Sequence, residues 1–225
     1  MDEQQVEVRS EDETKALAAQ LRKPTGEHGN EVAQFMNKGN RGINLHALAV
    51  LDASDNDRIL EIGMGNGHFT SRIVKGNANI KYRGLDYSQD MVDLSKELQI
   101  DLTKDHDVDF LCGDASSIPF KGGEFNKAFT VNTLYFWEDL RSSLQELHRV
   151  LDEGGMAVLA VRPAELLRKM PITKYDFIIR DDAEIREEIQ RSGFQKVSSV
   201  EVIEAPQMVF GQSIALSSVI YSAYK

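Results

Sequence analysis

The amino-acid sequence predicts a doubly wound α/β fold with a mostly parallel sheet. From residue 58 onward, short apolar segments alternate with segments of helical periodicity. The first apolar segment leads into a glycine-rich turn, and each of the first three is followed directly by a glycine or an aspartate. Alternating strands and helices are typical of βαβ units, whose right-handed crossovers place helices on both faces of a sheet.

Five strands are expected in the central part of the chain, over residues 58–62, 80–85, 108–112, 124–131 and 156–161. The helices between them are expected over about residues 68–74, 88–98 and 139–151. Ser88 is the expected N-cap of the second of these helices, because its hydroxyl can accept from a free backbone N–H. The Asp-Glu-Gly-Gly segment at residues 152–155 is expected to be a turn before the fifth strand.

The first part of the chain is polar, with helical patterns and no convincing strand. A first helix is expected to end before Pro24, since a residue that precedes proline avoids the helical conformation. The apolar face of a second helix is predicted by three residues at helical spacing, Val32, Phe35 and Met36. The chain therefore divides into residues 1–56, a helical extension or lid, and residues 57–225, the binding domain.

The C-terminal part predicts one helix followed by a hairpin. The helix is expected over residues 182–191. Two strand-like runs follow, residues 195–202 and 213–224, with little room for a crossover helix between them. An antiparallel hairpin fits this spacing and brings the sheet to seven strands.

The composition indicates a globular protein of a reducing compartment. Its 225 residues suit one domain, and a formal net charge of −10 disfavours a nucleic acid or an anionic membrane as main partner. The single cysteine, Cys112, excludes an intrachain disulfide and a thiolate metal cluster, and we expect it to be a small residue of the core. Residues 1–13 lack the apolar core of a signal peptide, and no window approaches the roughly 18 apolar residues of a membrane span. The expected location is the cytoplasm, and both a monomer and a homodimer stay open.

The most informative segment is residues 58–67, Arg-Ile-Leu-Glu-Ile-Gly-Met-Gly-Asn-Gly. Gly63, Gly65 and Gly67 follow a strand and lack a Cβ atom, so the backbone can turn tightly and approach a ligand. The loop lies at the carboxyl edge of the predicted sheet, where doubly wound folds bind their ligands. By itself such a triplet also fits an ordinary strand-to-helix turn.

Two carboxylates follow the next two strands. Asp86 ends the second strand, where an acidic side chain can accept from both hydroxyls of a ribose. Asp114 follows the third strand, where a carboxylate can accept from the exocyclic amine of an adenine. Each aspartate alone is more often a turn or cap residue, but the three features at the ends of successive strands predict a nucleoside site.

A dinucleotide site shares the glycine loop and the first carboxylate. The loop of NAD-binding folds is G-x-G-x-x-G, with a pyrophosphate at the helix N-terminus, whereas this loop is G-x-G-x-G. Glu61, two residues before Gly63, would oppose a pyrophosphate but suits a ligand with an ammonium and a sulfonium group. Electrostatics therefore favour S-adenosylmethionine as the cofactor, and an NAD-binding oxidoreductase is the alternative.

Four segments resemble motifs of the class I S-adenosylmethionine-dependent methyltransferases, in the order found in that family. They are residues 60–67, 84–88, 113–120 and 149–155. The resemblance covers about residues 56–161 and is closest to the small-molecule branch that includes the ubiquinone and menaquinone biosynthesis methyltransferases. It implies methyl transfer from S-adenosylmethionine and does not identify the acceptor.

The resemblance also implies contacts with the two ends of the cofactor. The three glycines pass under the methionine and ribose parts, and Glu61 lies near the methionine amino group. Asp86 accepts from the ribose hydroxyls, while Asn132, after the fourth strand, lies near the transferable methyl.

At the adenine end, the resemblance implies contacts on both faces and at the amine. Tyr87 and Met91 flank the adenine ring. Asp114 and Ala115 hold its exocyclic amine.

The acceptor side is less well defined by the sequence. Methyl transfer from a sulfonium is an in-line displacement whose rate can come from alignment of the reactants. A general base is needed only for a protonated acceptor, so no catalytic side chain is predicted, and no pattern of metal ligands is evident. After the fourth strand, Tyr135 and Trp137 are expected either to form an aromatic wall for the substrate or to pack against the next helix.

The predicted lid contains two polar, glycine-rich segments at residues 26–30 and 36–40. Asn37 and Asn40 are expected either to donate to the cofactor's carboxylate or to act only in turns, and His28 is expected to be a solvated bystander. The leading hypothesis is a methyltransferase for a small molecule. The alternatives are an NAD-binding oxidoreductase, a non-catalytic module that binds S-adenosylmethionine, and a protein or nucleic-acid methyltransferase, which the net charge does not favour.

Overall fold

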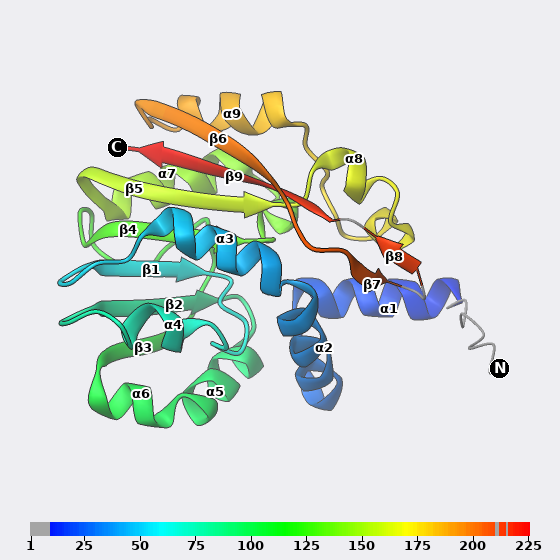
Figure 1. Cartoon of the computed structure of the whole chain (residues 1–225), viewed down its shortest axis with the longest axis horizontal. Coiled ribbons are helices and arrows are strands. Elements are labelled where there is room, and N and C mark those ends of the chain that lie inside the picture. Colours follow the sequence, from blue (N-terminus) through cyan, green and yellow to red (C-terminus); the bar gives the residue numbers. More distant parts are fainter. Residues whose placement is uncertain (1–9, 210–211, 215) are drawn as a thin grey trace.

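A seven-stranded sheet forms the centre of the computed structural model, which describes residues 10–209, 212–214 and 216–225 (Figure 1). The strands of this sheet are β1 (Arg58–Ile62), β2 (Lys81–Asp86), β3 (Asp107–Cys112), β4 (Phe125–Val131), β5 (Leu151–Val161), β6 (Lys196–Ile203) and β9 (Ser217–Tyr224). Their order is β3-β2-β1-β4-β5-β9-β6; β1 to β5 are parallel, and β9 runs antiparallel to β5 and β6. The predicted doubly wound fold with an antiparallel C-terminal pair is confirmed. Of residues 1–13, which lack the apolar core of a signal peptide, residues 1–9 lie outside the described residues.

Two details of the strands differ from the prediction. The short strands β7 (Gln207–Val209) and β8 (Gln212–Ile214) form a separate ladder between β6 and β9. Strand β5 begins early, because Leu151 already pairs with Phe125 before pairing resumes between Met156 and Lys127. Residues 152–155, predicted as a turn before the strand, therefore form a bulge within β5.

Helices cover both faces of the sheet and its carboxyl edge (Figure 1). They are α1 (Glu11–Arg22), α2 (Gly26–Gly39), α3 (Arg41–Leu51), α4 (Thr70–Val74), α5 (Gln89–Leu98), α6 (Ile100–Asp105), α7 (Leu140–Val150), α8 (Ala164–Leu167) and α9 (Asp182–Arg191). Neighbouring residues of β1 show how the faces divide: Ile59 belongs to a core with α3 to α6, and Leu60 to a core with α7 and α9. This follows from the alternation of side chains along a strand.

The N-terminal helices have two different positions. Helix α3 packs on the sheet through Ile43, Ala47 and Leu51, which are fully buried. Helices α1 and α2 instead lie beyond the carboxyl ends of β1 and β2 (Figure 1). Together with the turn that joins them, α1 and α2 form the lid, residues 11–39.

Two expectations about individual side chains are wrong. Phe35 is 63% exposed, because α2 buries its small residues Gly29 and Ala33 instead. A Cβ on Gly29 would lie 2.9 Å from the carbonyl carbon of Pro24, which shows how closely this side of α2 packs. Cys112 is exposed, because β3 is an edge strand and this residue ends it. None of the helices in the described part of the chain has the length and apolar character that a membrane span requires.

A buried ion pair fixes the junction between α2 and α3. The guanidinium of Arg162, just after β5, donates to the carboxylate of Glu204 and, at 2.9 Å, to the hydroxyl of Ser218. All three side chains are buried. The second nitrogen of the guanidinium lies 3.4 Å from the Gly39 carbonyl oxygen, at the end of α2. Because a buried charge is costly without its partner, the carboxylate of Glu204 is held in place and anchors the start of α3.

We expect Gly42→Ala to lower the free energy of unfolding by about 1–3 kcal/mol. A Cβ on Gly42 would lie 2.1 Å from Oε2 of Glu204, which is fixed by its ion pair. Urea denaturation measures the change. The matched control is Gly39→Ala in the preceding helix, where no atom lies within 4 Å of the added Cβ. Equal stability of the two variants would contradict the close approach of Glu204.

Candidate cofactor site

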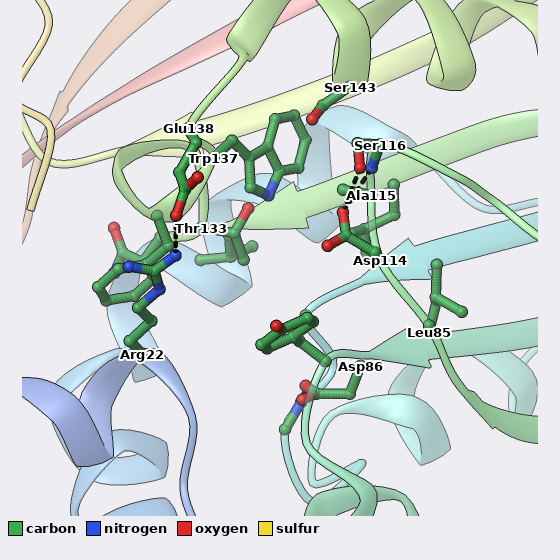
Figure 2. A pocket seen from close by; sticks show the side chains of 18 of the residues that line it. Arg22, Leu85, Asp86, Asp114, Ala115, Ser116, Thr133, Trp137, Glu138 and Ser143 are labelled. Atoms are coloured by element: carbon green, nitrogen blue, oxygen red, sulfur yellow. Dashed lines mark hydrogen bonds and ion pairs between the residues drawn. The ribbon is translucent and has the colours of Figure 1, made fainter. Parts of the chain in front are cut away.

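A cavity of about 470 Å³ opens between the carboxyl ends of the central strands and the lid (Figure 2). Its size is within the range usual for small-molecule sites. Among the predicted site residues, the lining includes Gly63, Gly65, Asp86, Tyr87, Asp114, Ala115, Asn132 and Trp137. The structure thus brings together most of the side chains that the sequence placed at separate strand ends.

The glycine loop has a backbone that other residues adopt only with strain. Gly63 has φ of +75° and Gly65 has φ of +58°, both in the left-handed region. A Cβ on Gly63 would lie 2.3 Å from Cγ2 of Thr133, whereas a Cβ on Gly65 would meet nothing within 4 Å. The loop is therefore packed against the end of β4 at Gly63 and leaves open space beside the cavity at Gly65.

Asp86 lies at the end of β2 and also braces the glycine loop. One carboxylate oxygen accepts from the backbone N–H of Gly65 at 2.8 Å, and the other accepts from that of Ser88 at 2.9 Å. Burial raises the pKa of Asp86 to about 6, against the effect of these hydrogen bonds. The carboxylate lines the cavity and is charged above that pH, so it can accept hydrogen bonds from a ligand.

Asp114 follows β3 on the same side of the cavity as Asp86 (Figure 2). Its Oδ1 accepts from the backbone N–H and the hydroxyl of Ser116, each at 2.7 Å. Its Oδ2 has no partner within the described part of the chain. A ligand amine can therefore be accepted by Oδ2 while Oδ1 keeps the side chain in place.

Asn132 presents an unpaired acceptor beside the cavity. It follows β4 with φ of +57° and is only 7% exposed. Its Nδ2 donates to Oδ1 of Asn40 at 3.0 Å. Its Oδ1 is buried and has no hydrogen-bond partner among the described residues. Buried polar atoms are normally paired, so this oxygen fits a ligand that brings an N–H or O–H group.

Four predicted site residues lie outside the cavity lining: Glu61, Gly67, Met91 and Tyr135. Glu61 is 5% exposed, and its carboxylate accepts from the hydroxyl of Tyr82, which in turn accepts from Thr70 at 3.3 Å. The position of Glu61 in β1 explains this, because alternation turns its side chain toward the α4 face, as for Ile59. Burial raises the pKa of Glu61 to about 7.

We expect Glu61→Gln to change how stability depends on pH. The folded-state pKa of about 7 lies above the ordinary value of 4.5. The folded protein therefore holds more protons between these values, and this group's contribution to stability is lost as pH rises to about 7. Glutamine keeps a partner for Tyr82 and does not ionise. The free energy of unfolding of the variant minus that of the wild type should therefore rise by about 2–3 kcal/mol between pH 5 and pH 8. Urea denaturation at both pH values measures it, and a pH-independent difference would contradict the buried ionisation.

Aromatic residues form the other wall of the cavity. Trp137 is 8% exposed and lines the cavity together with Phe136. Tyr135 instead stacks on Phe177 with ring centroids 4.7 Å apart and meets Phe136 edge-on. Of the two expected wall residues, the structure places Trp137 at the cavity and Tyr135 in the packing behind it.

The lid contributes residues that sequence reasoning missed. Leu21, Arg22, Pro24 and Met36 all line the cavity. Arg22 pairs with Glu138 at 2.7 Å, across from Asp86 and Asp114 (Figure 2). No local pattern distinguishes Arg22 from other exposed charges of a helix, because its role comes from a contact 116 residues away in sequence.

The turn between α1 and α2 also contacts the opposite side of the cavity, in the segment that follows β2. The hydroxyl of Ser88 donates to the Pro24 carbonyl, and the N–H of Gly26 donates to Asp90 at 2.7 Å. Lys23 lies 4.6 Å from the centre of the Tyr87 ring. The lid therefore bridges the end of β2 and the segment after β4.

The polar lid residues named from the sequence are not among those that line the cavity. Asn37 donates to Asn66 at 3.2 Å, and Asn40 accepts from Asn132. His28 is exposed and contacts Glu31, away from the cavity.

Comparison with known proteins agrees with this geometry. Residues 60–159 match the family model described as a methyltransferase domain. The chain carries a methyltransferase domain. The matched segment and the fold are similar to those of the methyltransferases that the four motifs resemble.

The similar proteins are distant from this chain in sequence. An uncharacterized methyltransferase of Bacillus subtilis, YdaC, is 25% identical over 126 residues, which are 56% of this chain and 67% of the relative. A demethylmenaquinone methyltransferase of Staphylococcus epidermidis is 26% identical over 114 residues, half of this chain and 46% of that protein. Among solved structures, a chain from the complex of the Haloferax volcanii Trm112 methyltransferase activator with a proposed methyltransferase has a TM-score of 0.71 and 21% identity. That likeness covers 96% of this chain and 98% of the other and concerns the fold.

Proposed function

We propose that this protein transfers a methyl group from S-adenosylmethionine to a small-molecule acceptor. The observation that supports it most is the convergence of complementary groups on one cavity. In this proposal the ribose hydroxyls donate to Asp86 and the adenine amine donates to Asp114. The open space at Gly65 admits the ribose and methionine parts.

The charges around the cavity disfavour NAD. Four carboxylates line it: Asp86, Asp114, Glu138 and Asp139. The only cation among the described lining residues is Arg22, which is already paired with Glu138. A pyrophosphate would add two negative charges to this surface, whereas S-adenosylmethionine brings a sulfonium and an ammonium group.

The chain's own contribution to the reaction is alignment. When bound, S-adenosylmethionine supplies a methyl group attached to a positively charged sulfur. The sulfur is the leaving group when the methyl passes in line to the acceptor. The lid and the segment after β4 enclose the cavity and limit access of water, so the acceptor meets the methyl in a fixed direction. Neither histidine nor lysine occurs among the described lining residues. We therefore propose that a proton released from the acceptor passes to water or to a lining carboxylate rather than to an imidazole.

The proposed acceptor is a flat, largely apolar molecule. Apolar surface at the cavity comes from both the lid and the segment after β4, through Leu21, Met36, Phe136 and Trp137. Aromatic walls of this kind favour planar ligands. The relative named demethylmenaquinone methyltransferase makes quinols the first class to test.

In the direct test, the purified protein is incubated with methyl-labelled S-adenosylmethionine and a panel of naphthoquinols and alkylated hydroquinones. We expect labelled product and S-adenosylhomocysteine in equal amounts for at least one member. Cofactor binding without transfer to any member would contradict the proposed acceptor class.

Trp137→Ala is expected to reduce kcat/KM for the methylated panel member by about tenfold or more, from the loss of aromatic contact area. Binding of S-adenosylhomocysteine should weaken much less. The matched control is Tyr135→Phe, since that residue lies behind the wall and its hydroxyl makes no hydrogen bond among the described residues. A similar loss for both variants would argue against Trp137 as an acceptor contact.

A further inference from the structure

We infer that Asn40, at the junction of α2 and α3, is a positioning residue for the cofactor's ammonium group. It holds the amide of Asn132 through Nδ2, so that the buried and unpaired Oδ1 is left as the acceptor for that group. The inference rests on the proposed function and assigns to the junction of α2 and α3 a part in recognising the amino-acid end of the ligand.

The first step is the geometry of Asn132. Its backbone is held by the N–H donated to the Ala160 carbonyl at 2.8 Å and by the left-handed φ. The side chain then has one contact, from Nδ2 to Oδ1 of Asn40 at 3.0 Å. An amide that donates on one side must present its oxygen on the other. The hydrogen bond to Asn40 therefore leaves Oδ1 of Asn132, and not its Nδ2, unpaired for a ligand.

The second step is the ligand group that this oxygen receives. Asp86 and Asp114 follow β2 and β3, on one side of β1, whereas Asn132 follows β4 on the other side. The ribose and adenine donors belong to the side of the two aspartates. The remaining donor of S-adenosylmethionine is the ammonium group, and a buried amide oxygen without a partner gains most from a charged donor.

The third step is the rigidity of Asn40 itself. Its carbonyl oxygen accepts from the N–H of Asn44 at 3.0 Å and from the Asn44 side chain at 2.9 Å. The preceding carbonyl, of Gly39, lies within reach of Arg162 in the buried ion pair with Glu204. The side chain of Asn40 caps neither α2 nor α3. Among the described residues the side chain of Asn40 is hydrogen-bonded only to Asn132, so substitution removes that contact without removing a helix cap.

The test compares two ligands by calorimetric titration. S-adenosylhomocysteine carries the ammonium group, and 5′-methylthioadenosine lacks the amino-acid part. We expect Asn132→Ala to weaken binding of S-adenosylhomocysteine about tenfold or more and Asn40→Ala to weaken it about threefold to tenfold. Binding of 5′-methylthioadenosine should stay within about twofold for both variants. A merely structural role would weaken both ligands alike.

Asn40→Asp gives the sharpest outcome, because a carboxylate can only accept from Nδ2 of Asn132. This variant should retain at least about one third of the wild-type affinity for S-adenosylhomocysteine. Asn30→Ala, an exposed asparagine earlier on α2, is the matched control and should change nothing. A loss with Asn40→Asp as large as with Asn40→Ala would overturn the inference, since Nδ2 of Asn132 would then face the cavity.

The outcomes separate this inference from the proposed function. If the wild-type protein binds neither ligand, the proposed function fails. If it binds both, and Asn132→Ala leaves S-adenosylhomocysteine unaffected or weakens both ligands equally, only the positioning role fails.

Discussion

Replacing Asp86 with alanine is expected to weaken binding of S-adenosylhomocysteine at least about tenfold, the largest effect we expect from a single cofactor contact. Two ribose hydroxyls would lose a charged acceptor, and hydrogen bonds to a charged group are the stronger ones. The backbone N–H groups of Gly65 and Ser88 would also lose their partner, so the loop itself becomes less ordered. Calorimetric titration at pH 8, above the pKa of about 6, measures the effect with the carboxylate charged.

Two controls separate the ribose contact from a loss of structure. Asp93→Ala removes an exposed carboxylate from α5, whose contact is with Gln89, and should leave binding unchanged. The thermal unfolding of Asp86→Ala should remain cooperative, because the core on either side of β2 is untouched. Unchanged affinity in a folded Asp86→Ala protein would exclude the ribose assignment.

Gly63→Ala is expected to abolish measurable cofactor binding and to lower the free energy of unfolding by about 2–4 kcal/mol. The left-handed backbone at φ of +75° opposes any Cβ, and the added methyl would lie 2.3 Å from Cγ2 of Thr133. Relief of this contact moves either the glycine loop or the segment after β4. Both line the cavity, so stability and binding fall together.

A second substitution tests the steric cause. Thr133→Ser removes Cγ2 and keeps the hydroxyl that pairs with Thr130. We expect the double variant to recover about 1–2 kcal/mol of the loss in stability, since only the strain of the left-handed backbone remains. If Thr133→Ser brings no recovery in the Gly63→Ala background, the close approach is not the cause of the defect.

The sheet was predictable because its signals are local. Strands β1 to β4 are short apolar runs, and the helical segments that follow β1, β2 and β4 favour a parallel arrangement. The start of β5 was missed, because Asp-Glu-Gly-Gly at residues 152–155 has turn chemistry and its pairing depends on β4. The exposure of Phe35 was missed for a similar reason: the close contact of Gly29 with Pro24, and not hydrophobic periodicity, decides which side of α2 is buried.

The candidate site was predictable where a strand end determines it. Asp86, Asp114 and Asn132 each follow a parallel strand, and such ends meet at one edge of the sheet. The side chain of Glu61 points away from the cavity, because alternation along β1 turns it toward α4, where its carboxylate accepts from Tyr82. Arg22 could not be foreseen, since its contact with Glu138 depends on how the lid folds back over the domain.

The measurement that tests the central claim most directly is parallel calorimetric titration of the purified protein with S-adenosylmethionine, S-adenosylhomocysteine and NAD. Our account predicts micromolar binding of the first two, which corresponds to a binding free energy of about −8 kcal/mol. It predicts no detectable binding of NAD under the same conditions. Binding of NAD alone would mean that the glycine loop serves a dinucleotide and would contradict the account.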